Sequence, residues 1–482
     1  MKERVIKSID WLCVHPLRVG MIIACLVLFI TWFIQLVLLG LIVPQWSDGY
    51  GLVPGQDVTR FHRVAVEQAA LIREYGWSVW ELRPNGWGVS GILSAWYALT
   101  WSAPWAFVPV QALMYGLSGA LLFSLLSHLT GRPRWALIAL LPMILPTAAF
   151  VYAQPHRDLF VFMGLVSAIY GWWLLARMLS TPLGLQWILG LLCGAGLILA
   201  GFMVAWSVRA FTAEIFLGLS ILMIVILSVF FLCNIGSEPL SIYLFKITIP
   251  LIAVVLSFAM MSFHAGGGWN RYLTTAEEPI RVEDSVIEIS NPQNSTKISH
   301  KYNDVWRQSN WLPSKLDDRV RRLAGAREHF LINYSDGRSA VDVDIRFRSV
   351  EEMVPYMPRA LQIGLMSPFP NQWLPHEEAP AVRNVYRVVA GAEMVLIYVV
   401  LPFFLYAIYA WRKRPELWIM LLPALAWVLI YTYTVPVVGS LMRYRFSGYI
   451  ILIMLAMAGL LQAIHDYRNW RRLKSSVNHM NR

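Results

Sequence analysis

The sequence predicts an all-α polytopic membrane protein with about ten transmembrane helices and a small mixed subdomain outside the membrane. Two observations carry this prediction. Of the 482 residues, 57% are apolar and only 14% are charged, whereas charged residues make up about a quarter of a typical soluble chain. Long uncharged runs recur along the chain, and so much apolar surface needs lipid as its solvent. The composition therefore excludes a soluble enzyme.

Ten stretches are long and apolar enough to cross a bilayer, which takes about 20 residues in a helix. They are residues 20–44, 105–129, 134–153, 159–178, 185–206, 211–234, 241–263, 388–411, 415–436 and 446–465. The first stretch is too long for a signal peptide and lacks a small-residue cleavage site, so we expect it to remain as an anchor. An even number of spans places both chain ends on one side of the membrane.

Basic residues indicate which side that is, because Lys and Arg gather on the cytoplasmic side of membrane proteins. They cluster before the first span (Lys2, Arg4, Lys7, Arg18), between the second and third (Arg132, Arg134), at the end of the fourth (Arg177), after the eighth (Arg412, Lys413, Arg414) and in the tail (Arg468, Arg471, Arg472, Lys474). We therefore expect both chain ends in the cytoplasm. The net charge of +11 then reflects topology, and no nucleic-acid partner is expected.

This topology divides the chain into three parts. Residues 1–263 form an N-terminal transmembrane module whose first outer loop, 45–104, carries the candidate catalytic residues. Residues 264–387 form an extracytoplasmic loop subdomain, and residues 388–482 supply the last helices and a basic cytoplasmic tail. Short turns around 154–158, 207–210 and 437–445 also reach the outer face.

The 264–387 segment has a mixed pattern. Residues 282–290 alternate roughly as a strand does, whereas 314–333 and 349–366 have helical spacing. The second of these helices opens with Ser349 and Glu352 in a capping-box arrangement. We interpret it as an interfacial helix that returns the chain to the bilayer.

Charged residues on the outer face are the candidates for function, because the positive-inside rule does not account for them. The stretch after Asp57 carries Phe61, Val64, Ala65, Gln68, Ala69 and Ile72 on one helical face. Asp57 is then either a helix N-cap or a carboxylate held at the water–lipid boundary as a general base. Asp48 lies in a turn-forming sequence and is a second candidate for the base.

A short charged turn joins the third and fourth spans. His156, Arg157 and Asp158 follow one another there. They form either an interfacial anchor with an internal ion pair, or a phosphate site in which Asp158 orients the acceptor or holds a metal.

Three arginines lie at outer ends of spans, against the positive-inside bias: Arg209, Arg443 and Arg445. A planar guanidinium binds phosphate through two hydrogen bonds, so all three are candidate phosphate ligands. Glu393 lies near the outer end of the eighth span, where it either reaches the interface or pairs with Arg387 or Arg445.

The order of these features resembles the GT-C superfamily of polytopic glycosyltransferases. One span is followed by an outer loop with an aspartate that opens an amphipathic helix, then by paired spans with a charged outer turn, and finally by Arg443-Tyr444-Arg445 entering the last span. The resemblance covers mainly residues 20–178 and more faintly 440–465, by arrangement rather than by exact motif. It implies a GT-C-like fold and transfer of a sugar from a polyprenyl-phosphate or polyprenyl-diphosphate carrier.

The resemblance also implies roles for particular residues. Asp57 would be the base that activates the acceptor hydroxyl, and Arg445, with Arg443 beside it, would bind the phosphate. Many members carry paired acidic residues in the first loop, whereas here Asp57 is followed by Val58, so Asp48 remains the alternative base. His156, Arg157 and Asp158 would form the second-loop site.

The expected partners follow from this chemistry. They are a polyprenyl-phosphate-linked sugar donor, membrane lipids, and a glycan, lipid or protein acceptor. The site would face the periplasm or exterior of a bacterial inner (cytoplasmic) membrane. No cofactor is required by the residues, and a divalent cation is left open.

Two other classes of protein share part of the pattern. A polymerase or ligase of lipid-linked glycans would use the outer arginines without a particular need for Asp57. A lipid or polysaccharide flippase or transporter would place charges near the middle of the bilayer. If the glycosyltransferase interpretation holds, Asp57, His156, Arg157, Asp158 and Arg445 should converge on one outer cavity.

Overall fold

The computed structural model describes residues 15–53, 57–178, 181–209, 211–233, 248, 255, 306–334, 339–377, 379 and 381–480. Within these ranges every regular element is a helix, and the one β-type contact is an isolated bridge between Ala340 and Val437. The prediction of an all-α polytopic membrane protein is confirmed. The expected strand at 282–290 lies outside the described residues, so the mixed character of the loop subdomain stays a prediction.

The elements follow one another along the chain with these bounds: α2 (Pro16–Trp32), the π-helix η1 (Phe33–Ile42), η2 (Pro44–Trp46), α3 (Asp57–Tyr75), η3 (Trp77–Val79), η4 (Pro84–Gly86), α4 (Gly88–Leu99), α5 (Pro104–Thr130), α6 (Pro133–Ala139), η5 (Leu141–Ile144), α7 (Pro146–Tyr152), α8 (Arg157–Met178), α9 (Leu185–Val208), α10 (Thr212–Cys233), α13 (Ser314–Tyr334), α14 (Val350–Met366), η7 (Pro370–Gln372), α15 (Ala381–Val400), α16 (Phe403–Trp411), α17 (Pro415–Thr434) and α18 (Val438–Met480).

Seven helices of the described residues are long and apolar enough to cross a membrane, and two bent pairs bring the number to nine. The seven are α2 with η1, α5, α8, α9, α10, α17 and α18. The bent pairs are η5 with the preceding α6 against α7, and α15 against α16. These correspond to nine of the ten predicted spans. The remaining one, 241–263, lies outside the described residues except for 248 and 255.

Proline accounts for both bends. The chain turns by 72° between Ile144 and Pro146 and by 42° between Val400 and Phe403. Pro146 and Pro402 lie at these breaks, and proline lacks the N–H that an α-helix needs and clashes with the preceding turn. Leu145, before Pro146, is accordingly extended. The hydropathy pattern detects such a segment as one span and does not show the bend.

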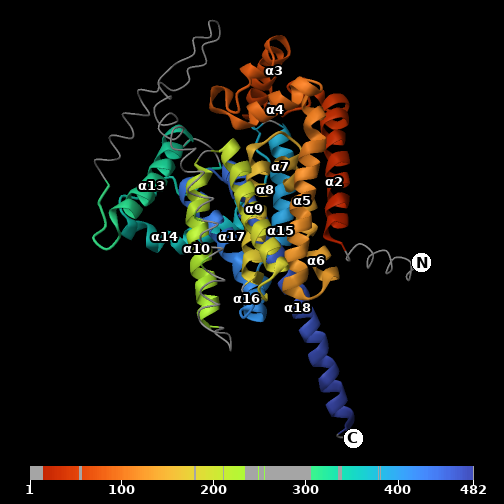
Figure 1. The fold of residues 1–482 in the computed structure, drawn as a ribbon, viewed down its shortest axis with the longest axis vertical. Helices are drawn as coiled ribbons and strands as arrows, with labels where there is room; N and C mark the ends of the chain where they lie inside the picture. Colours follow the sequence, from red (N-terminus) through yellow and green to blue (C-terminus); the bar gives the residue numbers. More distant parts are fainter. Residues whose placement is uncertain are drawn as a thin grey trace, which may run out of the picture.

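Small residues let the spanning helices approach closely. A Cβ atom on Gly164 of α8 would lie 2.5 Å from the carbonyl oxygen of Gly201 of α9, and one on Gly171 would lie 2.6 Å from that of Gly194. Without a hydrophobic force between helices in lipid, such backbone-to-backbone packing stabilises the pair. Helices α2 and α5 make a similar contact at Gly20 and Gly116, and Figure 1 shows them side by side.

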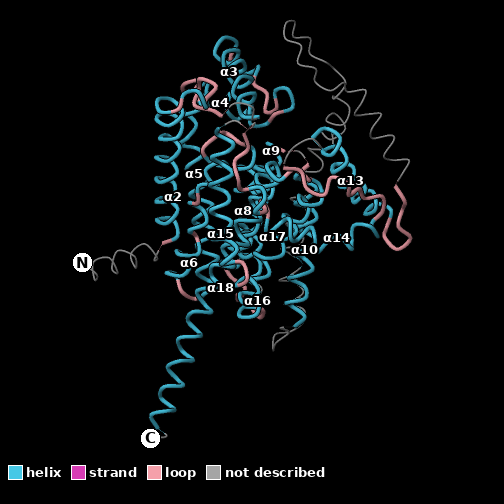
Figure 2. The backbone as a smooth tube through the Cα atoms, turned by 180° about the vertical axis from the view of Figure 1, so that it is seen from behind, coloured by secondary structure: helices cyan, strands magenta, loops and turns pink. Residues whose placement is uncertain are grey.

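The first outer loop and the C-terminal tail lie at opposite ends of the bundle. Figure 1 shows α3 and α4 at one end and the last part of α18 projecting from the other, and Figure 2 shows the same arrangement from behind. Helix α2 begins at the end where α18 projects. This arrangement agrees with the predicted topology, while the assignment of the tail to the cytoplasm remains a prediction.

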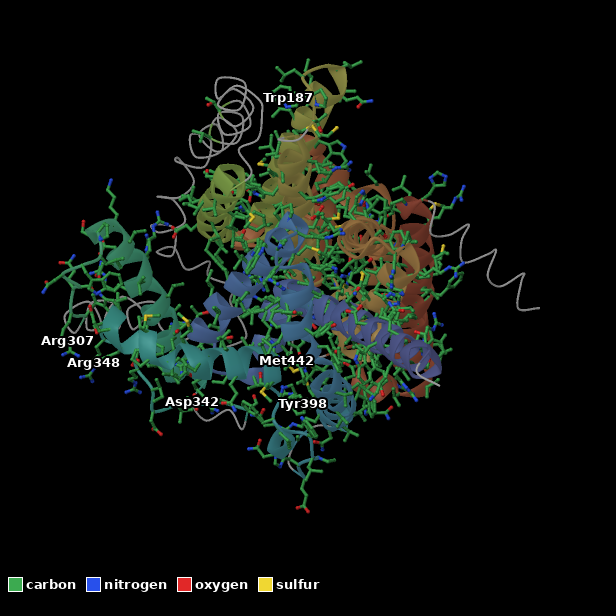
Figure 3. The ribbon with its side chains drawn as sticks, turned by 90° about the horizontal axis from the view of Figure 1, so that it is seen from below. Trp187, Arg307, Asp342, Arg348, Tyr398 and Met442 are labelled. Atoms are coloured by element: carbon green, nitrogen blue, oxygen red, sulfur yellow. The ribbon has the colours of Figure 1, made fainter. Side chains whose placement is uncertain are left out.

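Helices α13 and α14 flank the bundle and match the predicted helices at 314–333 and 349–366. Helix α14 packs against the outer part of α17, where Tyr433 donates to the carbonyl oxygen of Met353 at 2.9 Å. The predicted capping box is not formed: Ser349 makes no side-chain cap hydrogen bond, and Glu352 accepts from the N–H of Arg348 at 2.7 Å. In Figure 3, Arg307 and Arg348 lie at the edge of this flank.

Candidate functional site

Three distant parts of the chain meet at the carboxylate of Asp57. Its Oδ2 atom lies 3.2 Å from Nη2 of Arg157 and 3.7 Å from Nη2 of Arg443. The Asp57 side chain is 48% exposed, and those of Arg157 and Arg443 are 25% and 20% exposed. We call these three residues the outer cluster. Two partly desolvated arginines that share one accessible carboxylate form a site where an anion can exchange.

The amphipathic pattern of α3 places Asp57. All six predicted face residues are buried: Phe61, Val64, Ala65, Gln68, Ala69 and Ile72. The helix lies on α4, where the amide of Gln68 donates to the carbonyl oxygen of Glu81 and accepts from Ser94. Asp57 is the first residue of the helix, where the helix dipole favours a negative charge.

Two buried side-chain amides, which the sequence analysis did not single out, bind backbone carbonyl groups of the turn that precedes Arg157. Gln35 donates to the carbonyl oxygen of Ala153 at 2.7 Å, and Gln111 donates to that of Gln154 at 2.7 Å. These bonds satisfy carbonyl groups at the end of α7, which have no helical partner. A glutamine inside an apolar span is a detectable signal, because burying an amide is costly unless it is bonded.

Directly beneath the outer cluster lies a buried ion pair. Nη2 of Arg209 donates to Oδ1 of Asp158 at 2.7 Å, and each side chain is 4% exposed. Burial alone would lower the pKa of Arg209, but the adjacent Asp158 carboxylate raises it above its ordinary value. The guanidinium also lies 4.4 Å from the ring centre of Tyr444. Both residues are therefore charged and bound to each other, and neither is accessible to a ligand at the outer cluster.

His156 is buried between the outer cluster and this ion pair. Burial, reinforced by the nearby Arg443, lowers the pKa of His156 to about 3. The imidazole is thus neutral at physiological pH and adds no positive charge for a phosphate. It can still act as a hydrogen-bonding group.

Asp48 has the contacts of a turn residue. Its Oδ1 atom accepts from the N–H of Tyr50 at 3.0 Å, and its own N–H donates to the carbonyl oxygen of Leu52 at 3.0 Å. This is the Asx-turn geometry that the local sequence favours. In this arrangement the outer cluster uses Asp57 and not Asp48.

Arg445 departs from its expected role. Its guanidinium donates to the carbonyl oxygens of Ile363 and Gly364 at 2.7 and 2.9 Å and to Oγ of Ser367 at 2.7 Å, and a further bond reaches the carbonyl oxygen of Ser367. These groups form the C-terminal end of α14, where a cation is favoured by the helix dipole and by unpaired carbonyl groups. The side chain therefore links α18 to the end of α14 through its two terminal nitrogens, while its Nε is buried without a hydrogen-bond partner.

Glu393 also departs from expectation. Its carboxylate accepts from the N–H of Thr147 at 2.7 Å and from the hydroxyl of the same residue. Thr147 is the second residue of α7, so Glu393 caps the helix that restarts after the bend. It pairs with neither Arg387 nor Arg445 in this arrangement, because a helix N-terminus inside the bundle already supplies its donors.

A pocket with mainly apolar walls adjoins the outer cluster. Arg443 and Arg445 line it, together with Leu145, Phe150, Tyr386, Met442, Phe446 and Ile450 from the bent pair, α15 and α18. Figure 3 labels Met442 of this lining, which accepts from the hydroxyl of Tyr386 at 3.3 Å. Because Arg443 also reaches Asp57, the pocket combines a cationic end with an apolar body.

The described residues offer no ready metal site. No group of three or more His, Cys, Asp or Glu side chains within the described ranges is arranged to hold a metal ion. Asp57 and Asp158, the carboxylates nearest the site, each face arginines. In this arrangement both carboxylates are paired with arginines, and the divalent cation that the sequence analysis left open stays untested.

Comparisons with known proteins do not identify the chain. No family model matches it, and no curated protein matches it. Among solved structures, the chain is similar to the archaeal oligosaccharyltransferase AglB from Archaeoglobus fulgidus, solved in complex with an inhibitory peptide and a dolichol-phosphate. The TM-score is 0.42 and the identity 13%, over 95% of this chain and 52% of that one. This chain thus spans about half the length of that protein, and a similarity of this size assigns neither family nor activity.

Proposed function

We propose that this integral membrane protein is a GT-C-type glycosyltransferase that moves a sugar from a polyprenyl-phosphate or polyprenyl-diphosphate carrier to a hydroxyl acceptor. One observation carries the proposal: the carboxylate of Asp57 contacts two arginines from separate chain regions, and one of them, Arg443, lines a mainly apolar pocket. A polyprenyl-phosphate sugar has the matching shape, with an anionic head and an apolar tail.

Arg157 and Arg443 are the proposed phosphate ligands. Each is partly buried, and a guanidinium in a partly desolvated site binds phosphate more strongly than it does in water. Arg209 stays bound to Asp158 and supports the turn from below. The pocket that Arg443 lines would hold the first part of the polyprenyl chain.

Asp57 is the proposed general base. A sugar on a lipid phosphate is already activated, so the protein has to remove the acceptor proton and stabilise the departing phosphate. Direct displacement would invert the configuration at the anomeric carbon. The exposure of Asp57 leaves room for an acceptor hydroxyl, which a lipid, glycan or protein could supply.

The distribution of basic residues supports a position for this site on the periplasmic or exterior face of a bacterial inner membrane. Helices α3 and α4 would then lie on that face, opposite the basic tail. An acceptor on the outer face would reach Asp57 without crossing the membrane.

Photocrosslinking tests the donor class. The protein in nanodiscs is incubated with undecaprenyl phosphate that carries a photoreactive group on its first isoprene units, and the adducts are mapped by mass spectrometry. We expect adducts at Met442 or Tyr386, and we expect Arg443→Gln to reduce them. The matched control is Arg468→Gln, which removes a charge from the far end of α18.

Adducts spread over the lipid-facing helices and insensitive to Arg443→Gln would contradict the proposal. Adducts in the pocket, combined with transfer that does not depend on Asp57, would favour a polymerase or ligase of lipid-linked glycans. Movement of the lipid across the bilayer without transfer would favour a flippase.

A further inference from the structure

The proposed base and the phosphate of the sugar donor would both bind the same two arginine nitrogens. Oδ2 of Asp57 contacts Nη2 of Arg157 and Nη2 of Arg443, the groups that the proposed function assigns to the donor phosphate. While these two guanidinium groups engage Oδ2 of Asp57, that oxygen is a poor acceptor for an incoming hydroxyl proton. A phosphate oxygen in the same place would release it.

Of the acidic groups in and below the outer cluster, Asp57 is the one able to exchange. Asp158 is 4% exposed and bound to Arg209 at 2.7 Å, so moving it would leave a buried charge unpaired. Asp57 is 48% exposed and its closest arginine contact is 3.2 Å. Ion pairs between partly exposed groups are weak, so Asp57 can turn toward solvent at little cost.

We infer that Asp57 occupies the phosphate site of the empty enzyme and that the donor phosphate displaces it, which favours binding of the donor before the acceptor. This inference rests on the proposed function and adds an order of events to it. The benefit is chemical, because an unoccupied enzyme holds its base and phosphate ligands in mutual ion pairs rather than exposed to other ligands.

The charges balance through the reaction. The acceptor oxygen bonds to the anomeric carbon, the bond between that carbon and the phosphate oxygen breaks, and its electron pair stays on the phosphate. The acceptor proton passes to Asp57. A phosphodiester anion and a carboxylate thereby become a phosphomonoester dianion and a neutral carboxyl group, while Arg157 and Arg443 keep their charges. The neutral carboxyl no longer competes for the arginines when the new charge on the phosphate forms.

Equilibrium binding of undecaprenyl phosphate to the full-length protein in nanodiscs tests this inference. Asp57→Asn removes the competing carboxylate and should tighten binding by about two- to tenfold, the range expected from partly exposed ion pairs. The matched control is Glu67→Gln, which makes the same charge change on an exposed position of α3 and should leave affinity unchanged. Arg443→Gln should weaken binding.

The outcomes separate the two levels of interpretation. If Arg443→Gln weakens binding but Asp57→Asn binds no more tightly than the wild type, the proposed function stands and the displacement is wrong. If Glu67→Gln tightens binding as much as Asp57→Asn, the displacement is also wrong. If the wild type does not bind undecaprenyl phosphate, both the displacement and the proposed donor class are wrong. A structure of the lipid complex gives an independent check, since Asp57 should no longer contact both arginines.

Discussion

Arg443 and Arg445 lie two residues apart on α18 yet occupy different environments. Arg443 is 20% exposed and reaches Asp57 at 3.7 Å. Arg445 is 1% exposed, and its guanidinium bonds the C-terminal end of α14 through three carbonyl groups and one hydroxyl. Residues two apart on a helix point in directions about 200° different, so the same helix presents one arginine to the outer cluster and the other to its own scaffold.

The difference shows that the position of a charge along a span does not decide its role. Both arginines contradict the positive-inside rule equally, because that rule considers only which end of a span a residue occupies. The partners decide the role. A guanidinium whose donors are taken by backbone carbonyls is fixed, whereas one that shares an exposed carboxylate can accept a ligand.

The largest expected effect is a loss of turnover when Asp57 of the outer cluster is changed. Asp57→Asn keeps the size of the side chain but removes the base, so turnover should fall by about 10²–10⁴-fold. Transfer from a polyprenyl-phosphate sugar in nanodiscs measures this, with Glu67→Gln as the control of equal charge change. Near-normal turnover in Asp57→Asn would remove it as the base and return attention to Asp48 or to a polymerase-type reaction.

The next largest effect is expected on the stability of the protein when Arg445 is changed. Arg445→Ala leaves buried carbonyl groups of α14 without a donor and should lower the free energy of unfolding by about 3–5 kcal/mol, whereas Arg443→Ala should cost less than about 1 kcal/mol. Thermal unfolding in detergent, followed by loss of monodisperse protein, compares the two. Equal losses for both variants would mean that the two arginines do not differ in the way their contacts indicate.

Much of the fold could be predicted from the sequence, because hydropathy directly reports the solvent of each helix. The nine spans, the buried face of α3 and the helices α13 and α14 all follow from periodicity. The sequence shows the prolines at both bends, Pro146 and Pro402, but does not predict the bend angles. Whether a proline breaks a spanning helix depends on what satisfies the freed backbone groups, and at Pro146 that is Glu393 from another helix.

The candidate site was only partly readable from the sequence. The meeting of Asp57 with Arg157 follows from a shared membrane face, which the basic residues indicate. The commitment of Arg445 to α14, of Glu393 to α7, and the support from Gln35 and Gln111 depend on contacts between helices far apart in sequence. Hydropathy and spacing contain no information about such pairings.

A third prediction concerns the affinity for the donor. Arg443→Gln removes one charge-assisted contact and should weaken undecaprenyl phosphate binding by about 1.5–3 kcal/mol with unfolding nearly unchanged. Arg63→Gln is the control, because Arg63 lies on an exposed position of α3. Loss of affinity in both variants would point to a diffuse electrostatic attraction rather than a site.

A fourth prediction uses pH. The pKa of His156 is about 3 in the folded protein, against about 6.5 in an unfolded chain. Between these values the unfolded state binds one more proton, so stability should rise with pH from about 3 to about 6.5, by up to about 1.4 kcal/mol per pH unit, and level off above that. His156→Gln should flatten the dependence of the unfolding temperature between pH 5 and pH 7. An unchanged slope would mean that the pKa of His156 is the same in the folded and the unfolded protein.

The smallest effect is expected at Glu393, which belongs with Arg445 among the fixed groups. Glu393→Gln keeps one acceptor oxygen for Thr147, so it should lower the free energy of unfolding by about 0.5–1 kcal/mol, and Glu393→Ala, which removes both, by about 1–2 kcal/mol. Neither variant should change the affinity for undecaprenyl phosphate beyond its effect on folding. The two readouts, unfolding temperature and lipid affinity, separate a helix cap from a ligand-binding residue. If Glu393→Gln weakens lipid binding while its unfolding temperature matches the wild type, Glu393 is a ligand-binding residue. The binding site then extends deeper into the pocket than the contacts of Arg443 and Arg445 indicate.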